Sequence, residues 1–275
     1  MRRRYPRLLW RSNCGAMTRT WKFTDLELVV AWEALQADVL PSPFIFTSST
    51  PLYEDFQREK REIRRQLGSR IDDVAPVLDI VARPDIRIEL HGWGADFDDA
   101  DSQIRLLAVR REGYGYLLKQ LPGETAWHSG GYTITECGAL ELADLLIAEL
   151  PEATAGKLPD VVLASRDRNP DLDYSYGQSL VADTFDDTVD SLADQFLRTS
   201  ATGEGIIDVE QGLSRFGPRG VARSRLCWRD LADDGRYAIT PATPPVAVAA
   251  DIKRLTALLN SSIAEVVKAI RDERR

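Results

Sequence analysis

Apolar residues recur at helical spacing near the beginning of the chain, in the stretch FTDLELVVAWEAL. Leu28, Trp32 and Leu35 lie on one helical face, with polar positions between them. Thr24 comes directly before this run and Glu27 lies within it, at the spacing of a capping box. In a capping box each side chain accepts a hydrogen bond from the other residue's backbone N–H. The pattern therefore predicts a helix that begins directly after Thr24.

The same helical spacing predicts five further helices along the chain. Thr135 stands at the N-cap position of one of them, and Pro84 and Pro151 follow the ends of two others. The five predicted helices cover residues 52–67, 72–82, 136–150, 183–199 and 246–271.

Strand patterns occur between these helices. Two of them are hairpins with a similar design, IRLLAVRREGYGYLL and RLCWRDLADDGRYAI, each with a charged turn that contains Gly and a return strand that carries Tyr. Their turns are predicted at 111–113 and 233–235. Single strands are predicted at 86–93, 125–135 and 205–211.

The order helix, strand, loop, hairpin, helix occurs twice, and the first strands of the two copies begin at Ile86 and Ile206, 120 residues apart. Two copies of one module predict a pseudo-two-fold fold with a shared sheet. Both hairpins contain adjacent apolar positions, Leu106-Leu107 and Leu226-Cys227-Trp228, so we expect helices on both faces of that sheet.

The predicted organisation is one domain over 21–272, made of two halves. The halves span about 21–151 and 183–272, and a connector rich in Pro, Gly, Asp and Ser joins them over 152–182. Residues 1–20 have no periodicity and are predicted to be a disordered basic arm. The basic start has too short an apolar run for a signal peptide, and translation could begin at Met1 or Met17.

The distribution of charge along the chain argues against some classes of partner. The net charge is -8, and the first 19 residues hold six arginines and no acid, so the rest of the chain is more acidic still. Such a body repels a phosphate backbone, which argues against nucleic acid. The chain has no apolar run long enough for membrane insertion. Three widely spaced cysteines suggest neither a disulfide framework nor a metal site and fit a cytoplasmic location.

Five stretches, in this order and spacing, resemble the EspG family of type VII (ESX) secretion systems. They are FTDLELVVAWEAL with the following PSPF, VLDIVARPDIRIELHG, IRLLAVRREGYGYLLKQ, GLSRFGPRG and RLCWRDLADDGRYAI. The resemblance covers about residues 21–272. The loop SRFG departs from the family, in which a Gln is common, and the segment 166–180 is unusually acidic and rich in tyrosine.

The resemblance implies a central, mostly antiparallel sheet flanked by two helical subdomains, an α+β fold. It also implies a cytosolic chaperone rather than an enzyme, monomeric when free and without a cofactor. Such a protein binds a PE–PPE heterodimer or a similar WXG-type helical substrate and keeps that pair soluble for export.

Two loops carry the residues predicted to contact such a partner. One is the acid-rich loop after the strand at 86–93, and the other is the Gly/Arg loop before the second hairpin. The predicted partner-binding residues are Trp93, Asp96, Phe97, Asp98, Asp99, Asp101, Arg215 and Phe216. Trp93 could be an interface anchor or a core residue, and both interpretations stay open here.

Other functions are open to the same residues. The acid-rich loop lacks the Gly and Glu positions of a calcium-binding EF-hand, so no metal site is predicted. A small hydrolase or transferase could use His91 with the carboxylates of Asp96–Asp101. Two histidines are few for an enzyme, however, and His91 and His128 are interpreted as structural or solvent-facing. An immunity-type binding protein is a further alternative, because it would bind a partner through the same kind of surface as the chaperone and would need no catalytic pocket.

Overall fold

The computed structural model describes residues 19–35, 39–163 and 184–275. Nearly all of the predicted basic arm, and most of the predicted connector, lie outside these residues. The strands are β1 (Thr20–Phe23), β2 (Ile86–Gly94), β3 (Ile104–Arg111), β4 (Tyr114–Pro122), β5 (Ser129–Gly138), β6 (Val161–Val162), β7 (Ala201–Gln211), β8 (Arg223–Leu231), β9 (Arg236–Thr240) and β10 (Val246–Ala249). The helices are α1 (Asp25–Glu33), α2 (Tyr53–Leu67), α3 (Ser69–Ala82), α4 (Leu142–Ala148), α5 (Thr184–Arg198) and α6 (Ile252–Glu273), with short 3₁₀ turns η1 (Ala100–Ser102) and η2 (Pro218–Gly220).

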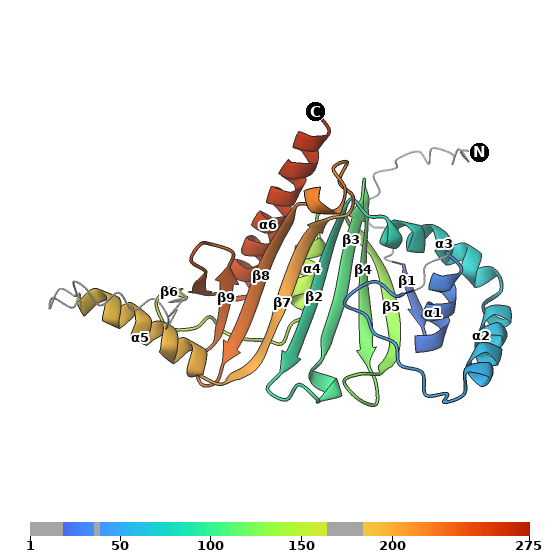
Figure 1. The fold of residues 1–275 in the computed structure, drawn as a ribbon, viewed down its shortest axis with the longest axis horizontal. Coiled ribbons are helices and arrows are strands. Elements are labelled where there is room, and N and C mark those ends of the chain that lie inside the picture. Colours follow the sequence, from blue (N-terminus) through green and yellow to red (C-terminus); the bar gives the residue numbers. More distant parts are fainter. Residues whose placement is uncertain (1–18, 36–38, 164–183) are drawn as a thin grey trace, which may run out of the picture.

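All ten described strands belong to one sheet (Figure 1). Their order is β1-β5-β4-β3-β2-β7-β8-β9-β10-β6, and every pair of neighbours is antiparallel. The α+β fold with an antiparallel sheet is therefore confirmed.

The centre of the sheet is the pair β2–β7, and the strand order is symmetric about it. From β2 the chain adds β3, β4 and β5 on one side, and from β7 it adds β8, β9 and β10 on the other. The two central strands are in register, with Ile88 opposite Val209 and Leu90 opposite Ile207. The two similar hairpins thus lie in one shared sheet, as their repetition in the sequence predicts, whereas the exact limits of the two halves stay a prediction.

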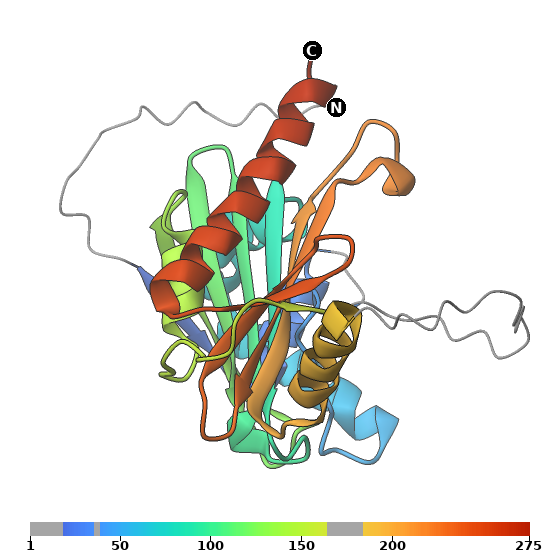
Figure 2. The same cartoon turned by 90° about the vertical axis from the view of Figure 1, so that its left-hand side faces the viewer.

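Helices α4 and α6 cover one face of the sheet, here called the back face. α6 crosses it diagonally beside α4 (Figure 2). The side chains that β2 and β7 point toward these helices are fully buried, because apolar residues alternate with polar ones along both strands. The core of this layer includes Ile88, Leu90, Leu146, Ile207, Val209, Leu255 and Leu259.

The opposite, front face is covered only at its two sides. α1 and α3 pack on β3, β4 and β5, and Phe196 of α5 packs edge-on against Tyr237 of β9, with ring centroids 5.3 Å apart. Between them the front positions of β2, β7 and β8 are exposed or half-buried. This open stripe consists of Arg87, Glu89, His91, Trp93, Glu204, Ile206, Asp208, Glu210, Arg223, Arg225, Cys227 and Arg229.

The expectation of helices on both faces is right for the first hairpin and for β9 of the second, but wrong for β8. In β3, both Leu106 and Leu107 are buried, on opposite faces. In β8, buried Leu226 and Trp228 alternate with arginines that pair across to acids of β7 and face the open stripe. The arginine side chains on the front of β8 are therefore paired with acids of β7 and are not covered by a helix.

Local signals in the sequence explain where several elements begin. Thr24 Oγ1 accepts from the backbone N–H of Glu27 at 3.2 Å, and the Glu27 carboxylate accepts from the N–H of Thr24 at 2.9 Å, which is the predicted capping box. The two hairpins turn through Glu112 (φ 56°) and Asp233 (φ 60°), at the predicted positions.

Two predicted helix starts are wrong. Thr135 does not cap a helix, because β5 continues through Cys137, which pairs with Gly115, and α4 begins only at Leu142. The last helix does not begin at Val246. Residues 246–249 pair with β9 as a strand, and Asp251 then caps α6 by accepting from Arg254 N at 2.8 Å.

Candidate functional site

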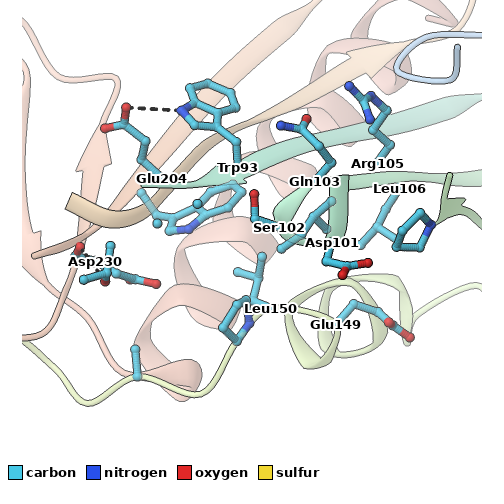
Figure 3. A pocket seen from close by; sticks show the side chains of 18 of the residues that line it. Trp93, Asp101, Ser102, Gln103, Arg105, Leu106, Glu149, Leu150, Glu204 and Asp230 are labelled. Carbon is cyan, nitrogen blue, oxygen red and sulfur yellow. Dashed lines mark hydrogen bonds between the residues drawn. The ribbon is translucent and has the colours of Figure 1, made fainter. Parts of the chain in front are cut away.

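A cavity of about 590 Å³ opens at the end of the sheet where β2 ends and β7 begins (Figure 3). It lies among the ends of β2, β4 and β8, the starts of β3 and β7, and the segment 149–153 that follows α4. α4 has only seven residues, so beyond Ala148 the chain borders the cavity as irregular backbone rather than as a helix.

Trp228, which is 2% exposed, contributes its indole to the lining of this cavity. Two glycines make room for that ring. A Cβ at Gly205 would lie 2.2 Å from Cη2 of Trp228, and one at Gly92 would lie 2.6 Å from its Cζ2. Glycine at both positions therefore lets a tryptophan from β8 reach across the two central strands.

The cavity lining is acidic. Five acidic side chains line it against two basic ones: Asp101, Glu149, Glu152, Glu204 and Asp230 against Arg105 and Lys119. Figure 3 shows Asp101 and Glu149 on one side of Leu150, and Asp230 on the other.

Several of these acids have ion-pair partners. Glu149 pairs with Lys119 at 2.6 Å and Asp230 with buried Arg236 at 2.6 Å. Among the described residues, Asp101 and Glu152 have no ion-pair partner, and both are exposed. The cavity mouth therefore favours a cationic or hydrogen-bond-donating group.

The acid-rich loop is organised by its own hydrogen bonds. Asp96 and Asp99 each accept from the backbone N–H two residues further on, at 3.0 Å and 3.2 Å, and Ser102 Oγ donates to the Asp99 carbonyl at 2.9 Å. Gln103 Nε2 donates to the carbonyl of Phe97 at 2.6 Å, which fixes the loop to the start of β3. In the part of the chain that the structure describes, no group of three His, Cys, Asp or Glu side chains is placed to hold a metal ion.

Four aromatic rings form a chain beside this loop. Ring centroids are 5.2 Å apart from His91 to Trp93, 5.8 Å from Trp93 to Phe97, and 6.1 Å from Phe97 to Trp127. Phe97 is 40% exposed and Trp127 is 56% exposed. This aromatic chain therefore offers contact area on the front side of the same sheet end.

Trp93 is neither a fully exposed interface anchor nor a fully buried core residue, the two roles that the sequence left open. It is half-buried, and its Nε1 donates to Glu204 Oε1 of β7 at 3.3 Å (Figure 3). Glu204 also pairs with Arg229 at 3.0 Å. The indole is thus held in place by the sheet, while Phe97 extends the aromatic surface outward.

His91 contacts an amide and a ring rather than a carboxylate. Its Nε2 lies 3.4 Å from Gln103 Oε1, and its ring packs on Trp93. Burial, and then the nearby Arg105 guanidinium, lower the pKa of His91, which keeps the imidazole neutral near pH 7. It faces the front of the sheet and does not line the cavity, so the arrangement expected for a hydrolase around His91 and Asp96–Asp101 is not formed.

The structure does not bring the two predicted loops together. Arg215 and Phe216 lie in the loop between β7 and β8, at the opposite end of the strands from Trp93 and Asp101 (Figure 1). With nine residues in β2, the separation is roughly 26 Å. Phe216 is 65% exposed and carries the Arg215 guanidinium 4.8 Å from its ring centroid.

The comparisons with known proteins bear on the whole of this architecture. The family model described as the EspG family matches residues 24–261. The chain belongs to the EspG family. The match covers both halves of the sheet, including the cavity, the acid-rich loop and the first ten of the 22 residues of α6 of this EspG-family protein.

One solved structure similar to this EspG-family chain is that of the Mycobacterium tuberculosis type VII secretion system chaperone EspG5 in complex with a PE25–PPE41 dimer. The identity is 10%, and the match covers 91% of this chain and 96% of that one, with a TM-score of 0.48. The comparison with curated proteins gives no match. Among the described helices, none has the length and apolarity needed to cross a bilayer.

Trp127 is the residue of this site that the sequence analysis missed. The stretch TAWHSGGYTIT predicts a strand from residue 125, but β5 starts at Ser129. Thr125 Oγ1 accepts from the N–H of Trp127 at 3.1 Å, and a turn brings His128 N to the Thr125 carbonyl at 3.0 Å. The Thr-x-Trp-His sequence of that turn is the signal that could have placed Trp127 in a loop.

Proposed function

We propose that this protein is a chaperone of a type VII secretion system that binds a PE–PPE-like helical heterodimer and keeps it soluble before export. Membership of the EspG family over residues 24–261 carries the proposal. The EspG5 chaperone, a structure similar to this chain, is itself bound to a PE25–PPE41 dimer. The protein acts in the cytoplasm and catalyses no reaction.

The binding surface is the sheet end that holds the cavity, the acid-rich loop and the aromatic chain. The cavity is acidic and has Trp228 in its lining, whereas Phe97 and Trp127 are exposed beside it. A helical tip with apolar side chains and a few basic ones matches both features, because the aromatic rings bury the apolar groups and the carboxylates meet the cations. Trp93 supports this surface from within, since Glu204 fixes its indole.

Arg215 and Phe216 do not belong to this surface, because they lie at the other end of the strands. The other six predicted partner-binding residues lie together at the cavity end of the sheet. They are Trp93, Asp96, Phe97, Asp98, Asp99 and Asp101. We retain these six as partner-binding residues and add Trp127.

The test separates the charged and the aromatic contributions. One variant replaces Asp96, Asp98, Asp99 and Asp101 with Asn, which keeps the local hydrogen-bond acceptors and removes the charge. A second replaces Trp127 with Ala. Binding to a PE–PPE-type pair encoded in the same genome is measured by calorimetry and by stopped-flow association at low and high salt.

The Asn variant should associate about tenfold more slowly at low salt and converge with the parent at high salt, because rim charges steer encounter. The Trp127→Ala variant should lose about tenfold or more in affinity at any salt concentration, as expected for an aromatic anchor. A matched control removes four exposed acids elsewhere, Asp72, Asp73, Asp160 and Glu265, and should slow association at low salt less than the loop variant does. If neither variant weakens binding, the surface is misplaced; if the parent binds no such pair, the chaperone assignment fails.

A further inference from the structure

The last turns of α6 extend beyond the sheet, at the end opposite the cavity (Figures 1 and 2). A groove of about 500 Å³ lies between this part of α6 and the turn that joins β5 to α4. It is lined by Arg110, Leu140, Asn260, Ile263, Ala264, Val267, Lys268, Arg271, Asp272 and Arg275. These ten residues are called the α6 groove below.

Part of the α6 groove is apolar and accessible. Leu140, in the turn between β5 and α4, is 84% exposed. Ile263 and Val267 pack only partly against the core, and Ala264 is exposed between them. A partner that covered these side chains would remove apolar surface from water.

The charged side chains of the α6 groove are nearly all basic. Four cations, Arg110, Lys268, Arg271 and Arg275, stand against one acid, Asp272, which lies 3.8 Å from Arg275. This balance is opposite in sign to the net charge of -8 of the whole chain.

Three of these cations lack partners. Within the described residues, Arg110, Lys268 and Arg271 form no ion pair, although acids outnumber bases in the chain. The Nε of Arg110 is also buried without a hydrogen-bond partner. The α6 groove therefore carries uncompensated positive charge, which attracts an anionic partner.

The shape of the α6 groove matches a helix. Asn260, Ala264, Val267 and Arg271 are spaced by four, three and four residues, so they follow one face of α6, and Arg275 lies just beyond its end. From Asn260 to Arg271 this face is about 17 Å long, roughly three helical turns. Ala264, a small residue in the middle, lets a second helix come close.

We propose that the α6 groove binds a helix of another protein that has an apolar face bordered by Glu and Asp side chains. The apolar face covers Leu140, Ile263 and Val267, and the acids pair with Arg110, Lys268 and Arg271. The proposal does not rest on the function proposed above, because the cavity lies at the other end of the sheet. The elongated shape of the groove along α6 favours a helix, and the vesicle experiment below tests a membrane as the alternative occupant.

The probe is a fluorescent peptide of about 18 residues, with Leu at every third and fourth position and Glu elsewhere. A second peptide carries Lys in place of Glu, and a third keeps the Glu residues but has Ser in place of Leu. Binding to the full chain is measured by fluorescence anisotropy at low and high salt. Vesicles of phosphatidylglycerol are tested in parallel by flotation.

Two variants target the α6 groove at exposed positions. Ala264→Trp fills it, and the double variant Lys268→Glu with Arg271→Glu reverses its charge. A matched control reverses the same charge on α2, at exposed Arg61 and Arg64, which form no ion pair in the described part of the chain. Circular dichroism and melting curves establish that each variant is folded.

The Leu/Glu peptide should bind the parent and the control equally, and both groove variants at least about tenfold more weakly. The peptides with Lys or with Ser should bind more weakly than the Leu/Glu peptide. The proposal is overturned if the Leu/Glu peptide fails to bind or binds both groove variants like the parent. It is also overturned if only vesicles bind through these residues, or if Ala264→Trp abolishes a concentration-dependent self-association, which would identify a second copy of the chain as the occupant.

Discussion

At the scale of single residues, the end of the sheet that holds the cavity depends on two large buried side chains, Trp228 and Arg236. Trp228 needs glycine at Gly92 and Gly205, because any Cβ there would overlap its ring. Arg236 is fully buried, and its guanidinium donates to both oxygens of Asp230, at 2.6 Å and 2.7 Å, and to the carbonyl of Pro151 at 2.8 Å. Arg236 thus fixes the segment after α4 to β9 and sets one wall of the cavity.

Gly205→Ala should destabilise the protein. The new methyl would be 2.2 Å from the Trp228 ring and 2.5 Å from the carbonyl oxygen of His91, so a ring or strand must shift. Overpacking of this kind costs about 1–3 kcal/mol, which for a chain of this size lowers the melting temperature by about 3–10 °C. Differential scanning calorimetry measures the shift.

The matched control for that change is Gly203→Ala on the same strand. A Cβ at Gly203 would have ordinary contacts, the nearest atom being Asp230 Oδ2 at 3.6 Å. It should leave the melting temperature within about 1 °C of the parent, as is usual for substitutions away from special features. Equal losses for both variants would show that strand glycines are needed for a reason other than Trp228.

At the scale of elements, the two halves differ most in their last helix. α4 has seven residues and α6 has 22, although each follows the strand next to the sheet edge, β5 or β10, and the two pack side by side on the back face. The short α4 leaves the cavity at one end of the sheet, and the long α6 extends past the other end. Helix length therefore gives a nearly symmetric sheet two unlike ends.

Because α6 begins at a single side-chain cap, Asp251→Ala should weaken it. Asp251 Oδ1 accepts from Arg254 N at 2.8 Å, and losing such a cap costs about 1 kcal/mol. The expected fall in melting temperature is about 2–4 °C. Asp272→Ala, at the other end of the same helix, removes an acid from the negative end of the helix dipole and should be neutral or slightly stabilising. A fall for Asp272→Ala as large as that for Asp251→Ala would contradict the capping argument.

The sequence predicts local structure well where the signal is local. The capping box at Thr24 and the turns at Glu112 and Asp233 depend on a few adjacent residues, and each is confirmed. Thr135 and Val246 were misassigned because pairing with other strands holds them in the sheet, Thr135 with Leu117 of β4 and Val246 with Thr240 of β9.

The candidate site is predictable only in part. The acid-rich loop and Trp93 stand out in the sequence, and they do lie together with Phe97. The cavity does not stand out, since it arises where a tryptophan of β8 crosses glycines of β7 and β2 and where α4 stops early. Arg215 and Phe216 were grouped with the loop because strand direction, which places them at the other end, is a property of the whole sheet.

At the scale of the whole molecule, the charge is unevenly distributed along the strand direction. The end with the cavity carries the acidic loop, and the end with the α6 groove carries the unpaired cations. Between them the open stripe is neutralised pair by pair, with Asp208 bonded to Arg225 at 2.7 Å and Glu210 to Arg223 at 2.8 Å. Because exposed pairs of this kind add little stability, their main effect is to keep the middle of the front face neutral.

Neither half should fold alone, because the seam between β2 and β7 is the centre of the core. Ile88 and Leu90 meet Val209 and Ile207 there, all fully buried. Fragments 19–163 and 184–275 should each be insoluble or unstructured when expressed singly, and should copurify with a native circular dichroism spectrum when coexpressed. A fragment that melts cooperatively by itself would show that the halves are independent domains.

The outer edges of the sheet have a consequence for the protein's own solubility. A sheet of ten strands could invite edge-to-edge polymerisation, which long, flat, uncovered edge strands promote. Here the described edge strands are β1 with four residues and β6 with two. The innermost strands, β2 with nine residues and β7 with eleven, have their backbone groups paired on both sides. The fold can thus present an open sheet face and exposed aromatic rings at high concentration while leaving little backbone free to seed a fibril.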